Sequence, residues 1–262
     1  RGDPGPEGSR EREAVVERAV KGRVVALVLA YNEEGSLPGL LAEIACECPE
    51  WETVVVSDGS TDGTERCVRS AGAVLLALPF NAGVAAAEQT GFLYAQHLGA
   101  DVVVRLDGDG QHPPSEARRV VAALERTNAD VVVGSRFIDG DGYQSTLLRR
   151  GGIRWLSFLL RALGGVRLTD PTSGLRAFRR RAFCLLASVY PNGYPEPESN
   201  LLMARAGLRV TEAPVRMRSR DAGRSSLGAW TALYYPVKVS FALLVEALRR
   251  PARPARDGES RG

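Results

Sequence analysis

The first half of the chain alternates short runs of β-branched apolar residues with longer stretches of mixed polarity. Runs that are apolar almost throughout are typical of strands buried on both faces, and the stretches between them are long enough for α-helices. This pattern predicts a doubly wound, mainly parallel α/β sheet. The expected strands are Val24–Ala30, Thr53–Val56, Val74–Leu78, Val102–Leu106 and Asp130–Val133, and the expected helices are Ser36–Cys46, Asp62–Ala71, Ala82–Leu98 and Ser115–Arg126.

The second half of the chain is less regular. We expect a helix from about Leu147 to Leu163, a loop over Thr169–Gly174 and a strand over Leu208–Met217. The segment Trp230–Leu248 is apolar but contains a proline and two charged residues. A transmembrane helix needs about 20 mainly apolar residues, so this segment is too short and too charged to span a membrane. It is either a core helix or a helix at an interface.

A polar motif follows each expected strand of the first half. The carboxyl ends of parallel strands meet at one edge of a sheet, and ligands of such sheets bind there. We therefore expect the five motifs to form one site. They are Tyr31–Glu34, Ser57–Ser60, Asn81–Gly83, Asp107–Asp109 and Gly134–Arg136.

The strongest local signal is the sequence DGDGQ at Asp107–Gln111. Two carboxylates separated by one residue lie on the same face of a strand, and the glycines let the backbone turn so that both can approach one cation. Hard divalent ions take oxygen ligands, commonly carboxylates together with substrate phosphates. Asp107, Asp109 and the side-chain carbonyl of Gln111 are thus candidate ligands of Mg²⁺ or Mn²⁺. A lone D-x-D pair is more often a turn, so the interpretation depends on its place after a strand.

Other acidic residues at this edge carry weaker patterns. Asp58 follows an apolar strand, where its carboxylate can accept hydrogen bonds from a base or a ribose. Glu33 has a similar place, although it or Glu34 could serve only the start of a helix. Asp62 is interpreted as the N-cap of the following helix.

Missing motifs argue against several enzyme classes. No G-x-G-x-x-G sequence follows the first strand, which argues against a nicotinamide dehydrogenase, and no Walker A sequence occurs. The two histidines, His97 and His112, give no Ser-His-Asp order. His97 falls on an apolar helix face and is expected to be structural, whereas His112 directly follows the acidic loop.

Charge is distributed unevenly along the chain. The segment Arg149–Arg224 carries 15 arginines and five acidic residues, a net charge of +10, whereas the rest of the chain carries −7. Guanidinium groups bind phosphate oxygens in a bidentate way, so the segment suits phosphate recognition, the alternative being a solvated basic face. No motif for nucleic-acid binding accompanies the charge. The four cysteines are not spaced as a zinc site and are expected to be reduced thiols, in keeping with a cytoplasmic protein.

Taken in order, these motifs resemble those of the inverting family 2 glycosyltransferases, which have the GT-A fold. The resemblance covers roughly Gly22 to Leu248, and two further motifs narrow it to the branch similar to dolichol-phosphate mannose synthase and other polyprenyl-phosphate transferases. These two motifs are Thr169–Phe178 (TDPTSGLRAF) and Gly223–Ser226.

The resemblance implies a function and a set of site residues. It implies transfer of a sugar from a nucleotide-diphosphate sugar to an acceptor, and the favoured acceptor is a polyprenyl phosphate. Mg²⁺ or Mn²⁺ would bridge the pyrophosphate of the donor. The nucleotide would be held by Tyr31, Glu33, Asp58, Asn81, Gly83 and Asp107, the metal by Asp107, Asp109 and Gln111, and the acceptor phosphate by Arg136, Arg150, Ser173 and Arg176. Asp109 and Glu196 would be the catalytic residues.

The chain departs from the family pattern in three places. The usual paired aspartate before Gly59 is Ser57-Asp58 here, which leaves the base of the nucleotide open. The acidic catalytic position falls in Tyr194–Glu198, interpreted as a loop interrupted by proline, where Glu196 is favoured. Transmembrane helices that many members of this branch carry are not found.

Alternatives to the polyprenyl-phosphate hypothesis stay open. The acceptor could instead be a hydroxyl group, which would need a general base. A sugar nucleotidyltransferase is less favoured, because the first strand is followed by Tyr31–Glu34 rather than a glycine-rich phosphate loop. A non-catalytic nucleotide-binding or scaffold protein is less favoured because every expected metal ligand is present.

The predicted organisation has four parts. Residues 1–22 are expected to be disordered or weakly helical, 23–226 to form the GT-A domain, 227–249 a C-terminal apolar or amphipathic helix, and 250–262 a disordered tail. The expected location is the cytoplasm, with possible peripheral contact at the inner face of the membrane through the basic segment and the apolar helix.

Overall fold

The computed structural model describes residues 22–138, 147–191, 193–218 and 229–251, which form seven strands and eight helices. The strands are β1 (Val24–Ala30), β2 (Glu52–Ser57), β3 (Val74–Ala77), β4 (Val102–Asp107), β5 (Val131–Ser135), β6 (Arg176–Arg179) and β7 (Val210–Pro214). The helices are α2 (Leu37–Glu47), α3 (Thr64–Ser70), α4 (Val84–His97), α5 (Pro114–Thr127), α6 (Leu147–Gly164), α7 (Arg180–Ser188), α8 (Pro195–Arg205) and α9 (Ala229–Leu248).

All seven strands form one sheet in the order β3-β2-β1-β4-β6-β5-β7. The pairs β3–β2, β2–β1, β1–β4 and β5–β7 are parallel, whereas β6 is antiparallel to both β4 and β5. The register places Leu29 of β1 opposite Asp107 of β4, and Arg105 of β4 opposite Arg176 of β6. The expected mainly parallel sheet is confirmed, and each of its five expected strands is present.

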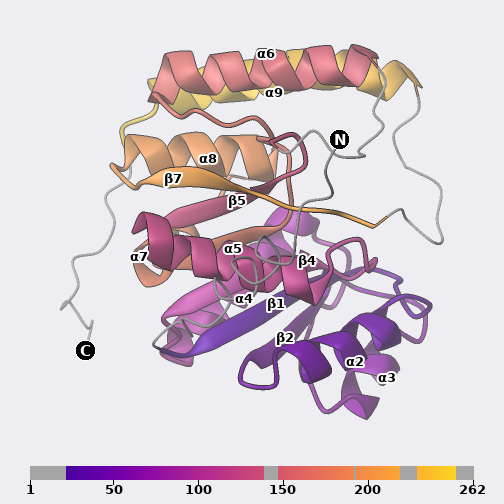
Figure 1. Cartoon of the computed structure of the whole chain (residues 1–262). Helices are drawn as coiled ribbons and strands as arrows, with labels where there is room; N and C mark the ends of the chain where they lie inside the picture. The colour runs from indigo at the N-terminus through magenta and orange to yellow at the C-terminus, as the bar shows by residue number, and fades with distance from the viewer. Residues whose placement is uncertain (1–21, 139–146, 192, 219–228, 252–262) are drawn as a thin grey trace, which may run out of the picture.

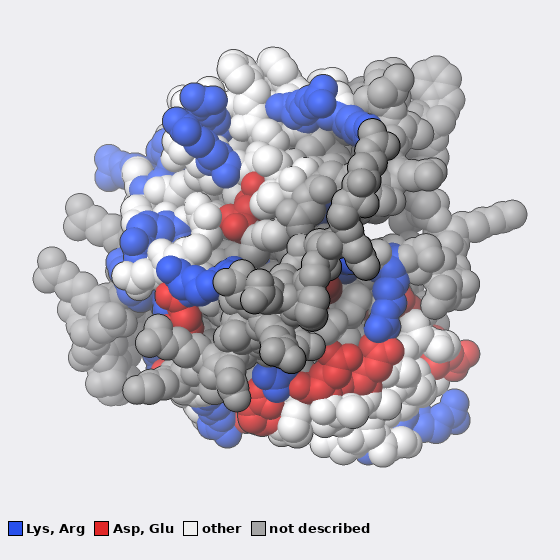
Figure 2. All heavy atoms as spheres, in the orientation of Figure 1, with Lys and Arg blue, Asp and Glu red and all other residues white. Residues whose placement is uncertain are grey.

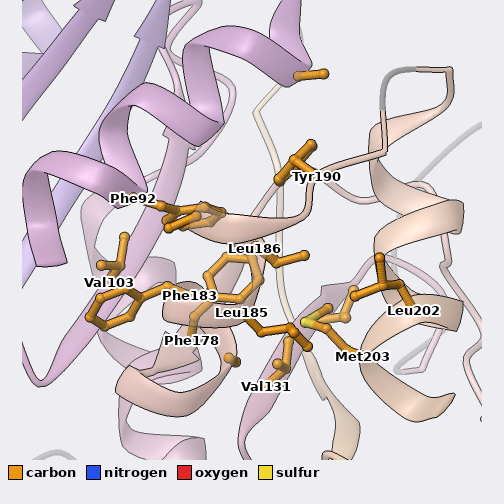
Figure 3. Packing of buried hydrophobic residues seen from close by; sticks show 14 of the residues in the cluster. Phe92, Val103, Val131, Phe178, Phe183, Leu185, Leu186, Tyr190, Leu202 and Met203 are labelled. Atoms are coloured by element: carbon orange, nitrogen blue, oxygen red, sulfur yellow. The ribbon is translucent and has the colours of Figure 1, made fainter. Parts of the chain in front are cut away.

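Helices cover both faces of the sheet (Figure 1). On one face, α4, α7 and α8 pack on the strands around an aromatic cluster of Phe92, Phe178, Phe183 and Tyr190 (Figure 3). The other face is covered mainly by α2 and α5. The sheet is therefore buried on both sides, which explains why its strands are apolar almost throughout.

Two parts of the second half differ from the expectation. The loop expected over Thr169–Gly174 leads into β6, an antiparallel strand that sequence patterns did not indicate. The segment Tyr194–Glu198 is not a loop, because α8 begins at Pro195. Prolines are tolerated in the first turn of a helix, where the backbone N–H groups have no acceptor in the helix, so Pro195 and Pro197 permit this start.

Helices α6 and α9 lie side by side as an outer layer above α8 (Figure 1). Val239 and Leu243 of α9 are fully buried in the same hydrophobic core as the aromatic cluster. Phe241 and Leu248, on the other side of α9, are 71% and 87% exposed. The segment is therefore both a core helix and a helix with an apolar outer face. No helix in the described ranges has the length and hydropathy to cross a bilayer. The expectations for residues 1–22 and 250–262 fall almost wholly outside the described residues, and the proposed division of the chain stays a prediction.

Candidate active site

The loops after β1 and β2 are joined by hydrogen bonds. Asn32 has a left-handed backbone (φ 56) and its Oδ1 accepts from the N–H of Thr61 at 2.8 Å. The backbone N–H of Glu33 donates to Oγ1 of Thr64 at 2.8 Å. The hydroxyl of Ser36 lies 2.7 Å from Oε2 of Glu33. These contacts give Glu33 a defined place at the sheet edge, while Tyr31 beside it is 47% exposed.

Asp58 directly follows β2 and is buried. Its two carboxylate oxygens accept hydrogen bonds from the backbone N–H groups of Ala82 (2.7 Å) and Gly83 (2.9 Å), where α4 begins. A carboxylate is favoured at the start of a helix, because the N–H groups there lack helical acceptors. Gly59 (φ 67) lets the two loops meet, since a Cβ atom on it would lie 2.4 Å from the backbone nitrogen of Asn81. Asp58 thus anchors the loop that contains Asn81 and Gly83.

The DGDGQ motif lies at the carboxyl end of β4. The N–H of Gly108 donates to the carbonyl of Leu29 at 2.8 Å, and its own carbonyl accepts from Ser36, which joins this loop to the one after β1. Oδ1 of Asp109 accepts from the N–H of Gln111 at 3.0 Å. Asp107 and Asp109 are both partly exposed, so their carboxylates are open to a ligand.

His112 and Gly174 border the carboxylate of Asp107. Nδ1 of His112 accepts a hydrogen bond from the N–H of Asp107 at 3.1 Å, which requires that nitrogen to be unprotonated. Burial lowers the pKa of His112 below its ordinary value, in agreement with a neutral ring. A Cβ atom on Gly174 would lie 2.7 Å from Oδ2 of Asp107, so only glycine lets the Thr169–Gly174 loop approach so closely.

A buried cluster of charged side chains lies between the end of β4 and the interior of the protein. Arg105 of β4 is 3% exposed, and its guanidinium donates to Oδ1 of Asp107 at 3.0 Å and to Oε1 of Glu196 at 2.9 Å. A third carboxylate, that of Glu88 on α4, lies 3.3 Å from the same guanidinium. Glu196 is in the first turn of α8, so this cluster joins α8 to the end of β4.

Arg176 shares the inner part of this cluster. It is fully buried, and its guanidinium donates to Glu88 at 2.9 Å and to Oγ of Ser199 at 2.7 Å. The hydroxyl of Tyr190 also donates to Glu88. Burial and the adjacent Glu88 carboxylate raise the pKa of Tyr190 well above its usual value, so it remains a donor.

The electrostatics of the cluster favour charged side chains. Burial alone would lower the pKa of Arg105, but Glu88, Asp107 and Glu196 together hold that pKa well above its usual value. Burial alone would also raise the pKa of Asp107, yet the charge of Arg105 outweighs it and holds the pKa below the ordinary value. Asp107 is therefore ionised at neutral pH.

The residues predicted to bind an acceptor phosphate lie in different surroundings. Arg136 follows β5 and forms a bidentate ion pair with buried Asp170, at 2.6 and 2.8 Å. Ser173 is buried, and its Oγ has no hydrogen-bond partner among the described residues. Arg150 is exposed on α6, whereas Arg176 belongs to the interior cluster.

The structure thus joins most of the predicted residues through shared contacts. Ser36 connects Glu33 with Gly108, the residue after Asp107. Asp58 binds the Asn81–Gly83 loop directly, and Asp107 and Glu196 share Arg105 as a partner. Arg105 and Glu88 were missed by sequence reasoning. A charged residue inside an otherwise apolar strand, as Arg105 is in VVVRL, was the available signal.

The acidic residues fit a hard cation. In the described part of the chain no group of three His, Cys, Asp or Glu side chains forms a metal cage by itself. The carboxylates of Asp107 and Asp109 nevertheless offer hard oxygen donors at an accessible loop. Such a partial set suits Mg²⁺ or Mn²⁺, which commonly complete their coordination with water and substrate phosphate oxygens.

Solved structures with a similar fold are GT-A glycosyltransferases. One is glucosyl-3-phosphoglycerate synthase from Mycobacterium tuberculosis in complex with Mn²⁺, uridine diphosphate and glucosyl-3-phosphoglycerate, with a TM-score of 0.62 and 20% sequence identity. The similarity covers 98% of this chain and 88% of that one. At this identity the likeness establishes the fold, which is GT-A as the sequence implied.

Sequence comparison identifies the family within that fold. The family described as glycosyl transferase family 2 matches residues 26–186, and the chain belongs to this family. It is 33% identical over 215 residues to the undecaprenyl-phosphate mannosyltransferase of Micrococcus luteus, covering 78% of this chain and 87% of the relative. It is also 31% identical over 218 residues to the polyprenol monophosphomannose synthase of Mycolicibacterium smegmatis, covering 78% and 81%. The protein is thus a glycosyltransferase.

The double contact of Asp58 predicts a stability effect. In Asp58→Asn the new NH₂ group would face one of the two backbone N–H donors, so we expect the free energy of unfolding to fall by about 1–3 kcal/mol. Urea unfolding would measure this. Asp101→Asn is the control, because exposed Asp101 accepts one backbone hydrogen bond and its amide oxygen could still do so. Equal losses in both variants would contradict the anchoring role.

Proposed function

We propose that the protein transfers a sugar from a nucleoside-diphosphate sugar to a polyprenyl phosphate, with inversion at the anomeric carbon and dependence on a divalent cation. The observation that carries the proposal is the open carboxylate pair at the end of β4, in a family 2 chain whose relatives include enzymes named for polyprenyl-phosphate acceptors. The GT-A fold supports a nucleotide-sugar donor, because a solved structure of similar fold contains bound uridine diphosphate.

The donor is assigned to the loops after β1, β2, β3 and β4. Tyr31 and Glu33 would contact the nucleoside, and the loop of Asn81 and Gly83, held by Asp58, would complete its pocket. Asp107 and Asp109, with Gln111, would hold Mg²⁺ or Mn²⁺. When bound, the cation would supply positive charge that stabilises the diphosphate leaving group.

The acceptor is assigned to the opposite side of the β4 end. A phosphate acceptor is ionised near neutral pH and needs positioning more than deprotonation. The buried hydroxyl of Ser173 has unused hydrogen-bonding capacity. The arginines assigned to the acceptor are exposed Arg150 and Arg136, whose charge is balanced by Asp170. Because Arg176 is enclosed by Glu88 and Ser199, we assign it a supporting role rather than contact with the phosphate.

The outer layer offers a surface for the lipid. We define the α6–α9 face as the exposed apolar residues Trp155, Phe158, Val237, Phe241, Leu244 and Leu248. Exposed cationic residues accompany them on the same helices, among them Arg154, Arg161 and Lys238. Figure 2 shows basic side chains with uncharged surface between them over this layer. An apolar face flanked by positive charge suits the surface of an anionic bilayer, from which a polyprenyl phosphate would be presented.

The metal assignment is tested at Asp109. We expect Asp109→Asn to abolish Mn²⁺-dependent sugar transfer to a polyprenyl phosphate while leaving the melting temperature unchanged. A thermal-shift screen of UDP-, GDP- and dTDP-sugars with Mn²⁺ would first identify the donor, because a bound ligand stabilises the folded state. Asp101→Asn is the matched control. Full activity of Asp109→Asn in buffer treated with a chelator would refute the metal assignment.

The acceptor class is tested at Glu196. With an ionised phosphate acceptor no base is required, so we expect Glu196→Gln to slow single-turnover transfer about tenfold through altered positioning, below the 10²–10⁴-fold range typical of a lost general base. Glu198→Gln, two residues along the same helix, is the control. A loss above about a thousandfold, within the general-base range, would make Glu196 a base and favour a hydroxyl acceptor.

Binding to the bilayer is tested with vesicles. Vesicles rich in phosphatidylglycerol should sediment the protein at low salt and release most of it at high salt, since salt screens the attraction. Phe241→Asp should weaken sedimentation, whereas Leu93→Asp, on exposed α4 surface away from this layer, should not. Equal sedimentation with phosphatidylcholine vesicles, or no effect of Phe241→Asp, would count against the α6–α9 face.

A further inference from the structure

The buried charges beneath the site have an arrangement that folding alone does not require. Arg105 and Arg176 are cross-strand neighbours on one face of the sheet, and both are almost fully buried. Like charges opposite each other on neighbouring strands repel, and burying each costs several kcal/mol unless it is paired. An apolar pair at these positions would avoid both costs.

Glu88 resolves the repulsion between the two arginines. It is fully buried on α4, and its carboxylate contacts Arg176 at 2.9 Å and Arg105 at 3.3 Å. Arg176 and Tyr190 also bind Glu88. Arg105 is the member of the cluster that contacts the partly exposed carboxylates of Asp107 and Glu196. Its two terminal nitrogens bind Asp107 and Glu196, which come from β4 and α8.

We propose that Arg105 is a positioning residue, which holds Glu196 of α8 and Asp107 of β4 in one fixed arrangement between the donor side and the acceptor side. The effect of Arg105 on sugar transfer rests on the proposed function, whereas its effect on the position of α8 rests on the contacts alone. One guanidinium fixes two carboxylates because its donors form a planar fork. Loss of the fork would leave the first turn of α8 without its side-chain link to the sheet edge.

The geometry also explains why Glu196 is suited to positioning. Its Oε1 accepts from Arg105, so one of its two oxygens is committed to the protein. Two cations face three carboxylates in this cluster, and the excess negative charge lies at the open end, where Asp107 and Glu196 are partly exposed. A cation bound at Asp107 and Asp109 would offset this excess.

The first experiment needs no substrate. In Arg105→Met, Glu88 keeps its bonds from Arg176 and Tyr190, so the variant should fold. We expect amide hydrogen exchange of residues 199–202 in α8 to become at least about tenfold faster, because a lost tether lowers the free energy of local opening. Arg179→Met is the control, since Arg179 also lies on a strand in an ion pair, with Glu125, but away from the site. Unchanged protection of α8 in Arg105→Met would overturn the proposal.

The second experiment measures coupling by a double-mutant cycle on kcat. If Arg105 acts through Glu196, Arg105→Met with Glu196→Gln should be no more than about threefold slower than Arg105→Met alone, because residues in one network are not additive. Arg105→Lys should recover part of kcat by restoring the charge. Losses that multiply would show that Arg105 does not act through Glu196.

The two experiments separate the proposals from each other. If the wild-type protein transfers no sugar to a polyprenyl phosphate with any of the three donors, the proposed function fails, and hydrogen exchange alone decides the role of Arg105. If the Arg105→Met protein does not fold, Arg105→Lys is used in the same exchange measurement. It keeps the charge without the planar fork, so faster exchange in α8 supports the proposal and unchanged exchange overturns it.

Discussion

Burial of the Arg105 guanidinium is the constraint on which the site depends. A charge enclosed in the interior must be paired, and the partners of Arg105 come from α4, from the end of β4 and from the first turn of α8. Helix α4 and strand β4 follow one another in the sequence, whereas α8 comes much later. Pairing one cation with all of them therefore sets where α8 begins relative to the sheet, and with it the place of Glu196 beside Asp107.

The loops after β1, β2 and β4 are joined differently, by short polar contacts between one loop and the next. Asp58 holds the start of α4, Asn32 holds the loop after β2, and Ser36 joins the loops after β1 and β4. Each of these contacts joins a side chain to a backbone group of another loop. The edge proposed to bind the donor is thus ordered by contacts within the chain, and a ligand there would meet side chains already in place, which reduces the entropy lost on binding.

Helix α8 connects the site to the outer layer. Its first turn carries Glu196, and its body packs against α6 and α9, whose outer sides expose Trp155 and Phe241. A ring contact between Tyr194, just before α8, and Tyr235 of α9 continues this connection. The proposed acceptor side and the proposed bilayer surface therefore share one packed unit, which suits an acceptor whose phosphate is at the membrane surface and whose chain is within it.

The sequence by itself determined the α/β class, the five parallel strands of the first half and the loops that follow them, because apolar runs and strand-end motifs are local patterns. It also predicted Asp107 and Asp109 as a cation site, which stays a prediction. The antiparallel strand β6 and the start of α8 at Pro195 needed the tertiary structure, since short segments with prolines or arginines carry weak local signals. Only the fold decided that Arg105, Arg176 and Glu88 meet, because pairing between distant buried charges depends on which strands and helices become neighbours.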